Sequence, residues 1–526
     1  MELKLSKPII NSAQLLEGDN LEVSFELESG AYPDYIYYSV YNYDGDNNLK
    51  ISEEELSPGS NSTGFIEFEG NIATLDLKFA NDGEAEGIEK FIASFYSDAE
   101  HTKGIRGSDF SFVVTDKELS QISYDSEWKN AIGLPENRIT VLSGISVDNQ
   151  NSIAIGTNGN HANDNYIKSF KYSPDGELLF ESELLSGHID NFKADGDISI
   201  TSDGGVIHTG YRWDSGIALI AKVNNEGLYE WSKEVEKDNW PMFEVSTIDK
   251  DGNIISAGRQ GLGDQFIYKL NPKGEELWSK SLEVIDSGAS FATSISTDSS
   301  NNIYITSDTQ PSTSQLTSID KNGEKRWSEE VGSRSWNPQV AIDDQDNIYF
   351  LGGDNQVVKL DANGSTQWST NIGYANDQWM GLAVNSSGVF AATNTGLPDT
   401  EFHDIGYSNN QEYYQNTIFK PTIHALSSDG ELLDISRIDL DGTEGVGPYA
   451  FAPITDDSFA FAYGYEGEVR LQRLNIGEYK DTNTGNVLEL GYSLKGDDNT
   501  GNPGGDAQTL GVNGSGLTNV AVLGPN

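Results

Sequence analysis

Aromatic side chains stand beside carboxylate and amide groups between residues 396 and 416, a combination that suits the binding of a sugar. Flat rings stack on the apolar faces of sugars, and nearby oxygen and nitrogen atoms bond the hydroxyl groups. Three tryptophans that each precede a predicted strand extend this set. The candidate ligand-binding residues are Trp240, Trp336, Trp379, Phe402, His403, Tyr413 and Tyr414. The alternative interpretation is that the tryptophans pack in the interior, as large aromatic residues commonly do.

Oxygen-bearing side chains recur at alternate positions in residues 44–55, with the spacing of an EF-hand calcium loop. They stand at loop positions 1, 3, 5, 9 and 12, and the apolar Ile51 stands at position 8. Calcium takes about six to eight oxygen ligands, and this spacing wraps them around one ion. Position 6 departs from the pattern, because it holds Leu49 where an EF-hand has glycine. The candidate ligands are Asp44, Asp46, Asn48 and Glu55, and the alternative interpretation is a solvated acidic loop.

Residues that could support catalysis form no recognisable constellation. The chain has no cysteine, so it offers no thiolate nucleophile and no zinc–thiolate site. The histidines lack H-x-x-x-H spacing, and no G-x-S-x-G turn presents a nucleophilic serine. Carboxylates are so abundant that a pair for glycoside hydrolysis has no distinctive position. We therefore expect binding rather than catalysis, and the alternative is a polysaccharide-active hydrolase or lyase.

The charge of the chain limits its partners. Its 83 acidic and 33 basic residues give a formal net charge of −50. Such a field repels phosphate backbones and anionic lipids, so we expect neither a nucleic-acid partner nor insertion into a membrane. Near the amino terminus the sequence shows no apolar run of a Sec signal peptide. The composition favours an extracellular, cell-surface or virion location, reached by a carboxy-terminal secretion signal or by lysis.

A repeat begins near residue 140 and predicts the elements that must position the candidate residues. A turn of Asp, Asn, Ser and Gly precedes an apolar residue seven times, in steps of about 41 to 53 residues with one longer step of about 70. Repeats of this length are typical of propeller blades. We predict a seven-bladed β-propeller, with six or eight blades as alternatives. The closing apolar residues are Ile153, Val206, Ile254, Ile303, Ile348, Val389 and Phe459.

A second motif lies out of phase with the first. A glycine is followed four residues later by tryptophan, as in Gly274 with Trp278 and Gly364 with Trp368. The glycine closes a tight turn, and the tryptophan packs an outer strand against the next blade. Residues 124–133 contain Trp128 without preceding inner strands, whereas the last blade, around 447–475, lacks such a strand. We therefore expect residues 124–133 to close the ring.

The segment before the propeller alternates apolar and polar residues in about seven short runs, as in residues 21–27, 74–79 and 91–96. This pattern predicts an Ig-like β-sandwich. The fold class is thus all-β, with a sandwich at 1–120 and a propeller at 121–477. Residues 478–526 are rich in Gly, Asn and Asp and read as a tail.

The amino-terminal domain resembles the Calx-β family. The resemblance rests on Glu17-Gly18-Asp19, on the run from Ala80 to Phe91 with its D-x-x-x-E-G-x-E-x-F spacing, and on Phe112-Val113-Val114-Thr115-Asp116. It implies a sandwich whose loops bind calcium at one end. By position, the implied calcium ligands are Glu17, Asp82, Glu86 and Asp116. The family often ends in a run of Asp, whereas Lys117 and Glu118 follow here.

The propeller resembles the SBBP and PQQ-like repeats of bacteria. The resemblance rests on Gly252-Asn253-Ile254 and on the run from Phe266 to Gly274, and it extends over about 140–475. It implies the fold and says little about function, because unrelated functions share propellers. No ligand set for a quinone cofactor is identifiable. The combined architecture is similar to surface proteins of marine bacteria and virion proteins of their phages, and implies a calcium-binding protein whose propeller binds a glycan or a surface protein.

Overall fold

The computed structural model describes residues 4–476 with internal gaps, together with 479–480 and 487–488. The longest gaps are 51–55, 82–86, 116–123, 133–138, 283–289, 373–379, 405–412 and 439–448. The described residues form strands and turns and no α-helix, which confirms the predicted all-β fold. The chain forms two compact units, one of Met1–Ser120, Ile372–Ala375 and Thr395–Lys420, the other of Gln121–Asn371, Asn376–Asn394 and Pro421–Asn526.

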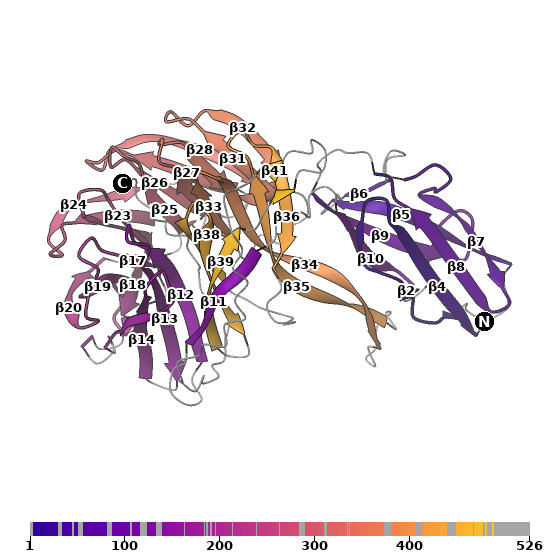
Figure 1. The fold of residues 1–526 in the computed structure, drawn as a ribbon, viewed down its shortest axis with the longest axis horizontal. Coiled ribbons are helices and arrows are strands. Elements are labelled where there is room, and N and C mark those ends of the chain that lie inside the picture. The colour runs from indigo at the N-terminus through magenta and orange to yellow at the C-terminus, as the bar shows by residue number, and fades with distance from the viewer. Residues whose placement is uncertain are drawn as a thin grey trace. The chain divides into compact units, whose positions relative to one another are not determined.

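The first unit contains a β-sandwich (Figure 1). One layer consists of β1 (Lys4–Leu5), β2 (Ile9–Ile10), β4 (Asn20–Ser29) and β8 (Ile72–Lys78). The other consists of β3 (Gln14–Leu16), β5 (Tyr35–Asp44), β6 (Asn47–Lys50), β7 (Thr63–Glu69), β9 (Ile88–Tyr96) and β10 (Phe110–Thr115). The hairpin β7–β8 joins the two layers. Alternate residues of β8 are buried, as expected for a sheet with one face on a core.

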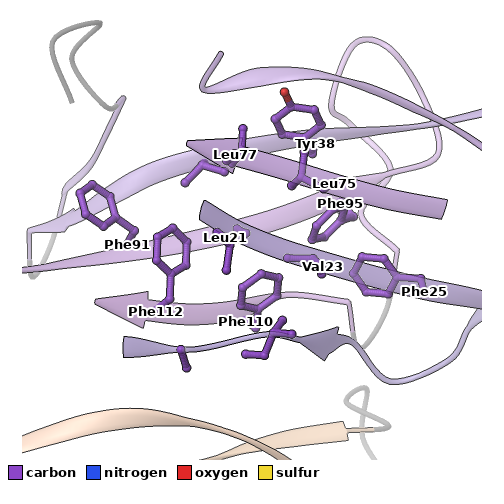
Figure 2. Close-up of a cluster of buried hydrophobic side chains, with 14 of the residues drawn as sticks. Leu21, Val23, Phe25, Tyr38, Leu75, Leu77, Phe91, Phe95, Phe110 and Phe112 are labelled. Carbon is purple, nitrogen blue, oxygen red and sulfur yellow. The ribbon is translucent and has the colours of Figure 1, made fainter. Parts of the chain in front are cut away.

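Aromatic and aliphatic side chains from both layers fill the core of the sandwich, as Figure 2 shows. Phe91 of β9 and Phe112 of β10 stack with ring centroids 5.4 Å apart. Phe25 of β4 meets Phe95 of β9 edge to face at 4.6 Å. Such pairs add stability beyond the area that they bury, so they join the two layers directly.

The second unit is a β-propeller of seven sheets, as the repeat predicted. Each sheet runs from an inner to an outer strand. In the second blade, β16 and β17 both pair with β18. The first three blades are β12 (Ile139–Val147), β13 (Ile153–His161), β14 (Asp164–Tyr172) and β15 (Leu178–Glu181); β16 (Phe192–Lys193), β17 (Ile198–Ile200), β18 (Val206–Arg212), β19 (Ile217–Val223) and β20 (Tyr229–Val235); and β21 (Pro241–Ile248), β22 (Ile254–Gln260), β23 (Asp264–Leu270) and β24 (Glu276–Leu282).

Three further blades follow in chain order. They are β25 (Ser290–Thr297), β26 (Ile303–Thr309), β27 (Thr313–Ile319) and β28 (Lys325–Ser333); β29 (Gln339–Ile342), β30 (Ile348–Leu351), β31 (Gln356–Leu360) and β32 (Thr366–Asn371); and β33 (Met380–Asn385), β34 (Gly388–Asp404), β35 (Tyr413–Leu426) and β36 (Leu432–Arg437). A short 3-10 turn, η3 (Gly353–Asn355), joins β30 to β31. Beyond the last blade, β40 (Tyr479–Lys480) pairs with β41 (Val487–Leu488).

The seventh blade takes its outer strand from the beginning of the propeller sequence. It consists of β37 (Tyr449–Thr455), β38 (Ser458–Tyr465), β39 (Glu468–Ile476) and β11 (Tyr124–Ile132). β11 pairs antiparallel with β39, and Trp128 lies opposite Arg473. Residues from this blade and from the first blade share one hydrophobic cluster, which includes Ala460 and Ile155. The ring is therefore closed by pairing and by packing.

Tryptophans of the outer strands pack over glycines in the turns of neighbouring blades. A Cβ added at Gly323 would lie 3.0 Å from the Trp278 ring, and the φ of this glycine is +87°. The Trp278 indole N–H donates to the carbonyl of Lys321, 3.1 Å away. The other pairs are Trp128 with Gly176, Trp231 with Gly274, Trp327 with Gly364 and Trp368 with Gly430. Only glycine leaves room for the ring at this backbone conformation.

The long step of the repeat forms an extended hairpin from β34 and β35 (Figure 1). Its outer part, residues 395–420, belongs to the unit of the sandwich. The Gln415 amide acts like a neighbouring strand, because it accepts from the Ser111 N–H and donates to the Ser111 carbonyl, each at 2.7 Å. Gln14 of β3 donates to the carbonyl of Pro398 at 3.4 Å. The outer part of the hairpin β34–β35 thus covers backbone groups of β10 that would otherwise lack a partner strand.

Deletion of β11 should destabilise the propeller, because it leaves β39 as an unpaired edge and removes the Trp128 contact. We expect a chain lacking residues 1–133 to melt roughly 10 °C below a chain lacking only residues 1–123. Both chains lack the sandwich, so the comparison isolates the closing strand. Differential scanning calorimetry measures both, and equal melting temperatures would contradict closure by β11.

Candidate ligand-binding face of the propeller

The two ends of the propeller differ in how their polar groups are used. At one end, the turn end, the first two strands and the last two strands of each blade are joined by short turns. The carboxylate of Asp249 accepts the N–H groups of Asp251 and Asn253, and that of Asp298 accepts those of Ser300 and Asn302. Asp148 and Asp343 do the same in their blades. These side chains serve the turns themselves.

Buried lysines reinforce three of these turns. Lys269 lies 2.7 Å from the carboxylate of Asp249, and both side chains are buried. Lys171 meets Asp148 at 3.0 Å, and Lys222 meets Asp203 at 2.6 Å. Each lysine comes from the third strand of its blade, so the pair links the turn to the middle of the sheet. The paired carboxylates are therefore committed to their turns, whereas other polar side chains there, such as Asp175 and Lys250, are exposed.

The other end, the loop end, carries the segments that join the second strand to the third and each blade to the next. Among its described residues, Trp240 stands out in the link between β20 and β21. Its side chain is 58% exposed. Its φ is +56° and that of Asn239 is +59°, although the following residue is Pro241. A bulky residue rarely adopts this conformation, and a residue before proline is further restricted, so the backbone is strained here.

Packing holds the Trp240 ring in place. A Cβ added at Gly216, in the turn between β18 and β19, would lie 2.8 Å from the indole. One side of the ring therefore rests on the second blade while the rest faces outward. Strain of this kind persists where the surrounding structure enforces it, and it concentrates at ligand sites.

An ion pair in the third blade also contacts the fourth blade and the loop that carries Trp240. Arg259 of β22 donates to the Glu244 carboxylate at 2.6 Å and to the Gly261 carbonyl at 2.7 Å. Glu244 also accepts the N–H of Ala292, on the inner strand of the fourth blade, at 2.9 Å. A Cβ added at Gly261 would lie 3.4 Å from Cβ of Asn239, so this network reaches the Trp240 loop.

Glu244 is buried, and its surroundings oppose ionisation. Desolvation raises its pKa to about 7, although the Arg259 guanidinium and the Ala292 N–H favour the charged form. It sits where the register of β21 shifts against β22, between Phe243 and Val245. The bulge turns its side chain toward the next blade. The residue positions Arg259 and lies too deep to meet a ligand.

Two cationic side chains at the loop end lie over aromatic rings. Arg259 lies 4.4 Å from the centre of the Phe291 ring. Lys237, three residues before Trp240, lies 5.2 Å from the Phe266 ring and 5.9 Å from the Tyr268 ring. Aromatic faces hold cations in defined places. An exposed indole such as that of Trp240 can stack on a polyhydroxylated molecule.

The structure describes part of the predicted ligand-binding set. Trp240 lies at the loop end, whereas Trp336 and Trp379 lie outside the described residues. The backbones of Phe402 and His403 belong to β34, and those of Tyr413 and Tyr414 belong to β35. These four therefore stand on the hairpin of the sandwich unit. The sequence pattern did not single out Lys237, Arg259 or Glu244, because none of them belongs to a recognisable motif.

The predicted calcium ligands lie mostly in undescribed segments. Asp82, Glu86, Asp116, Asp46 and Glu55 are outside the described residues. Glu17 is buried beside β3, with 7% of its surface exposed. Within the described part of the chain, no three His, Asp or Glu side chains are grouped as metal ligands. Calcium binding stays a prediction.

The described residues on either side of the predicted EF-hand turn form a strand hairpin. Asp44 pairs with Asn47, Tyr43 with Asn48 and Tyr41 with Lys50 across the antiparallel hairpin β5–β6. Asp46 and residues 51–55 lie outside the described residues, so the EF-hand site stays a prediction. The glycine that gives an EF-hand its sharp turn is Leu49 here, and this residue continues the strand instead.

Two histidines are buried inside blades rather than exposed at either end. His208 of β18 is fully buried, and neither of its ring nitrogens has a hydrogen-bond partner among the described residues. Burial lowers its pKa to about 3. Burial, with the nearby Arg437, likewise lowers the pKa of His424 to about 3. Both imidazoles are therefore neutral near pH 7, and both belong to the cores of their blades.

Comparison with known proteins supports the propeller assignment. Residues 263–397 match the family described as outer membrane protein assembly factor BamB. This match confirms a PQQ-like repeat over less than half of the chain. No curated protein matches the sequence. In the described part of the chain, no helix has the length and apolar character to cross a membrane.

Solved structures with a similar arrangement share little sequence with this chain. BamB from Moraxella catarrhalis is 14% identical, with a TM-score of 0.39, over 68% of this chain and 99% of that one. A quinonprotein alcohol dehydrogenase-like protein from Bacteroides thetaiotaomicron is 12% identical, with a TM-score of 0.36, over 81% and 93%. Sqt1 from Chaetomium thermophilum is 12% identical, with a TM-score of 0.40, over 66% and 84%.

Acid should destabilise the propeller through His208. Below about pH 6.5 an unfolded histidine binds a proton, whereas the folded His208 does so only near its lowered pKa of about 3. Stability therefore falls as the pH decreases through this window. We expect His208→Met to reduce the slope of unfolding free energy against pH, near pH 5, by about 1.4 kcal/mol per pH unit. Urea titrations measure this slope, and an unchanged slope would show that folded His208 is already protonated there.

Proposed function

We propose that this chain is a non-enzymatic binding protein whose ligand docks on the loop end of the propeller, at Trp240. The observation that carries the proposal is an exposed indole held by a left-handed backbone before proline. Folding alone gives no reason to keep a strained and exposed tryptophan at a link between blades. A ligand contact gives one, because stacking needs a flat ring in a fixed orientation.

The chemistry of the site favours a neutral polyhydroxylated ligand, such as a glycan on a surface. Lys237, three residues before Trp240, supplies a donor, while the net charge of −50 opposes polyanions. A surface protein that presents such a patch is the second class of partner. The composition and the resemblance to surface and virion proteins support an extracellular or virion-associated location.

We further propose that the sandwich binds calcium through Glu17 and the acidic segments at 82–86 and 116. The support is the Calx-β resemblance and the position of Glu17, whose N–H donates to the carbonyl of Thr115 at 3.1 Å. That bond brings Glu17 near the segment that begins at Asp116. In the proposed site the calcium ion would neutralise carboxylates that otherwise repel one another.

Replacing Trp240 by glycine should abolish ligand binding and leave the fold intact. Relief of about 1–3 kcal/mol of backbone strain offsets the lost contact with Gly216, so we expect stability to change by about 1 kcal/mol or less. A glycan array identifies ligands of the unaltered protein, and calorimetry compares the two proteins. Leu277→Gly, which removes another exposed side chain of the propeller, is the control. Unchanged binding by the Trp240 variant would place the site elsewhere, and release of new reducing ends from a bound glycan would favour the hydrolase alternative.

Calcium should stabilise the sandwich. We expect the ion, at 100 times its dissociation constant, to raise the unfolding free energy of this domain by about 2.7 kcal/mol. Glu17→Gln should reduce the effect, whereas Glu22→Gln, which alters an exposed side chain of β4, should not. Calorimetric titration of the full chain measures binding, and the absence of heat at millimolar calcium would contradict the proposal.

A further inference from the structure

The outward face of the sandwich carries a continuous group of aromatic rings, here called the aromatic strip. It consists of Tyr35 and Tyr37 of β5, Phe65 of β7, Tyr96 of β9 and His101 of the following loop. The strand register places Tyr37 opposite both Phe65 and Tyr96. The strip therefore crosses three adjacent strands of one sheet.

These rings face away from the core. The residues that alternate with them, Ile36, Tyr38 and Phe95, are buried in the hydrophobic cluster between the layers (Figure 2). Phe65 is 58% exposed and Tyr35 is 39% exposed. Strands with one solvated face normally place polar residues there. The aromatic residues are thus additional to what the fold requires.

Neighbouring rings of the strip are in contact. Tyr35 and Phe65 meet edge to face with centroids 5.0 Å apart, and Tyr37 lies 6.5 Å from both Phe65 and His101. The Tyr96 and His101 rings stack in parallel at 4.7 Å. Contacts of this kind limit the motion of each ring, so the surface is formed before any ligand arrives.

The loop that carries His101 is also fixed. His101 has a φ of +53°, an uncommon conformation for a residue other than glycine. The Asp98 carboxylate accepts the N–H groups of Thr102 at 3.0 Å and Lys103 at 2.9 Å. The loop therefore holds the imidazole against Tyr96 by its own hydrogen bonds.

Most positions of the aromatic strip carry rings or hydroxyl groups, and an acidic side chain borders it. The outward positions between Tyr35 and Tyr41 on β5 and between Ile92 and Tyr96 on β9 carry no acidic side chain, whereas the exposed Glu67 of β7 lies directly opposite Tyr35. The polar groups among them are hydroxyls, such as Ser39, which donates to the Tyr96 hydroxyl at 3.3 Å. Flat rings interspersed with hydroxyl groups match the apolar faces and hydroxyl edges of sugars.

We infer that the aromatic strip is a second ligand surface, which binds a neutral linear polysaccharide along the sheet. The net charge of −50 disfavours an anionic polymer, an anionic membrane and a second copy of the chain. Glu67, opposite Tyr35, can accept a hydrogen bond from a sugar hydroxyl group. Rings on adjacent strands about 4.8 Å apart can stack on successive sugar units. This inference is independent of the site at Trp240.

The test is affinity electrophoresis and calorimetry of the full chain with laminarin, xylan, galactomannan and hydroxyethyl cellulose, and with anionic alginate. We expect at least one neutral polysaccharide to bind, and Tyr37→Ser/Phe65→Ser to weaken it roughly tenfold or more. Ile72→Ser, which alters an exposed residue of the opposite layer, is the matched control. Phe65→Tyr keeps a ring and should retain binding, and urea titrations confirm that each variant folds.

Several results would overturn the inference. They are the absence of binding by every neutral polysaccharide, equal affinity of the double variant and the Ile72 variant, or stronger binding of alginate. Dissociation of a dimer by the double variant, without any polysaccharide binding, would identify the strip as a protein interface. If Trp240→Gly abolished all binding while the double variant bound normally, the propeller site would be supported and the aromatic strip would not be a ligand surface.

Discussion

Closure of a ring is the constraint on which the propeller depends. Each blade buries apolar residues only against its neighbours, as in the cluster that joins Ile207 of the second blade to Phe243 of the third. A gap anywhere would expose two such faces. The chain avoids this by ending the last blade with its first propeller strand, β11 against β39. Tryptophans that pack on glycines of the next blade then join neighbouring blades. Ion pairs between lysine and aspartate hold the turns within a blade.

This arrangement separates structural polar groups from those available for binding. At the turn end, carboxylates are held by their own backbone and by buried lysines, so most of the repeated acidic residues are structural. At the loop end, the links are less regular, and there the exposed Trp240 and the cations Lys237 and Arg259 lie. Repeated residues thus build the scaffold, and departures from the repeat provide the candidate site.

The sequence predicted the fold well because its signals are local and repeated. A turn residue such as Asp249 and a Gly274–Trp278 pair act over a few residues, and seven copies reinforce one another. The site was less predictable. The conformation of Trp240 depends on Gly216, 24 positions away, and the Glu244–Arg259 pair depends on a bulge that has no sequence signature. The EF-hand spacing stays a prediction, because Asp46 and Glu55 lie outside the described residues.

The central claim is that the loop end, and not the turn end, meets the ligand. Hydrogen exchange of the propeller amides, with and without a bound glycan, tests it most directly. The account predicts slower exchange in residues 236–240 and 259–263 when the ligand is present. Protection confined to the turns at 249–253, 271–275 and 320–324, with none at the loop end, would contradict it.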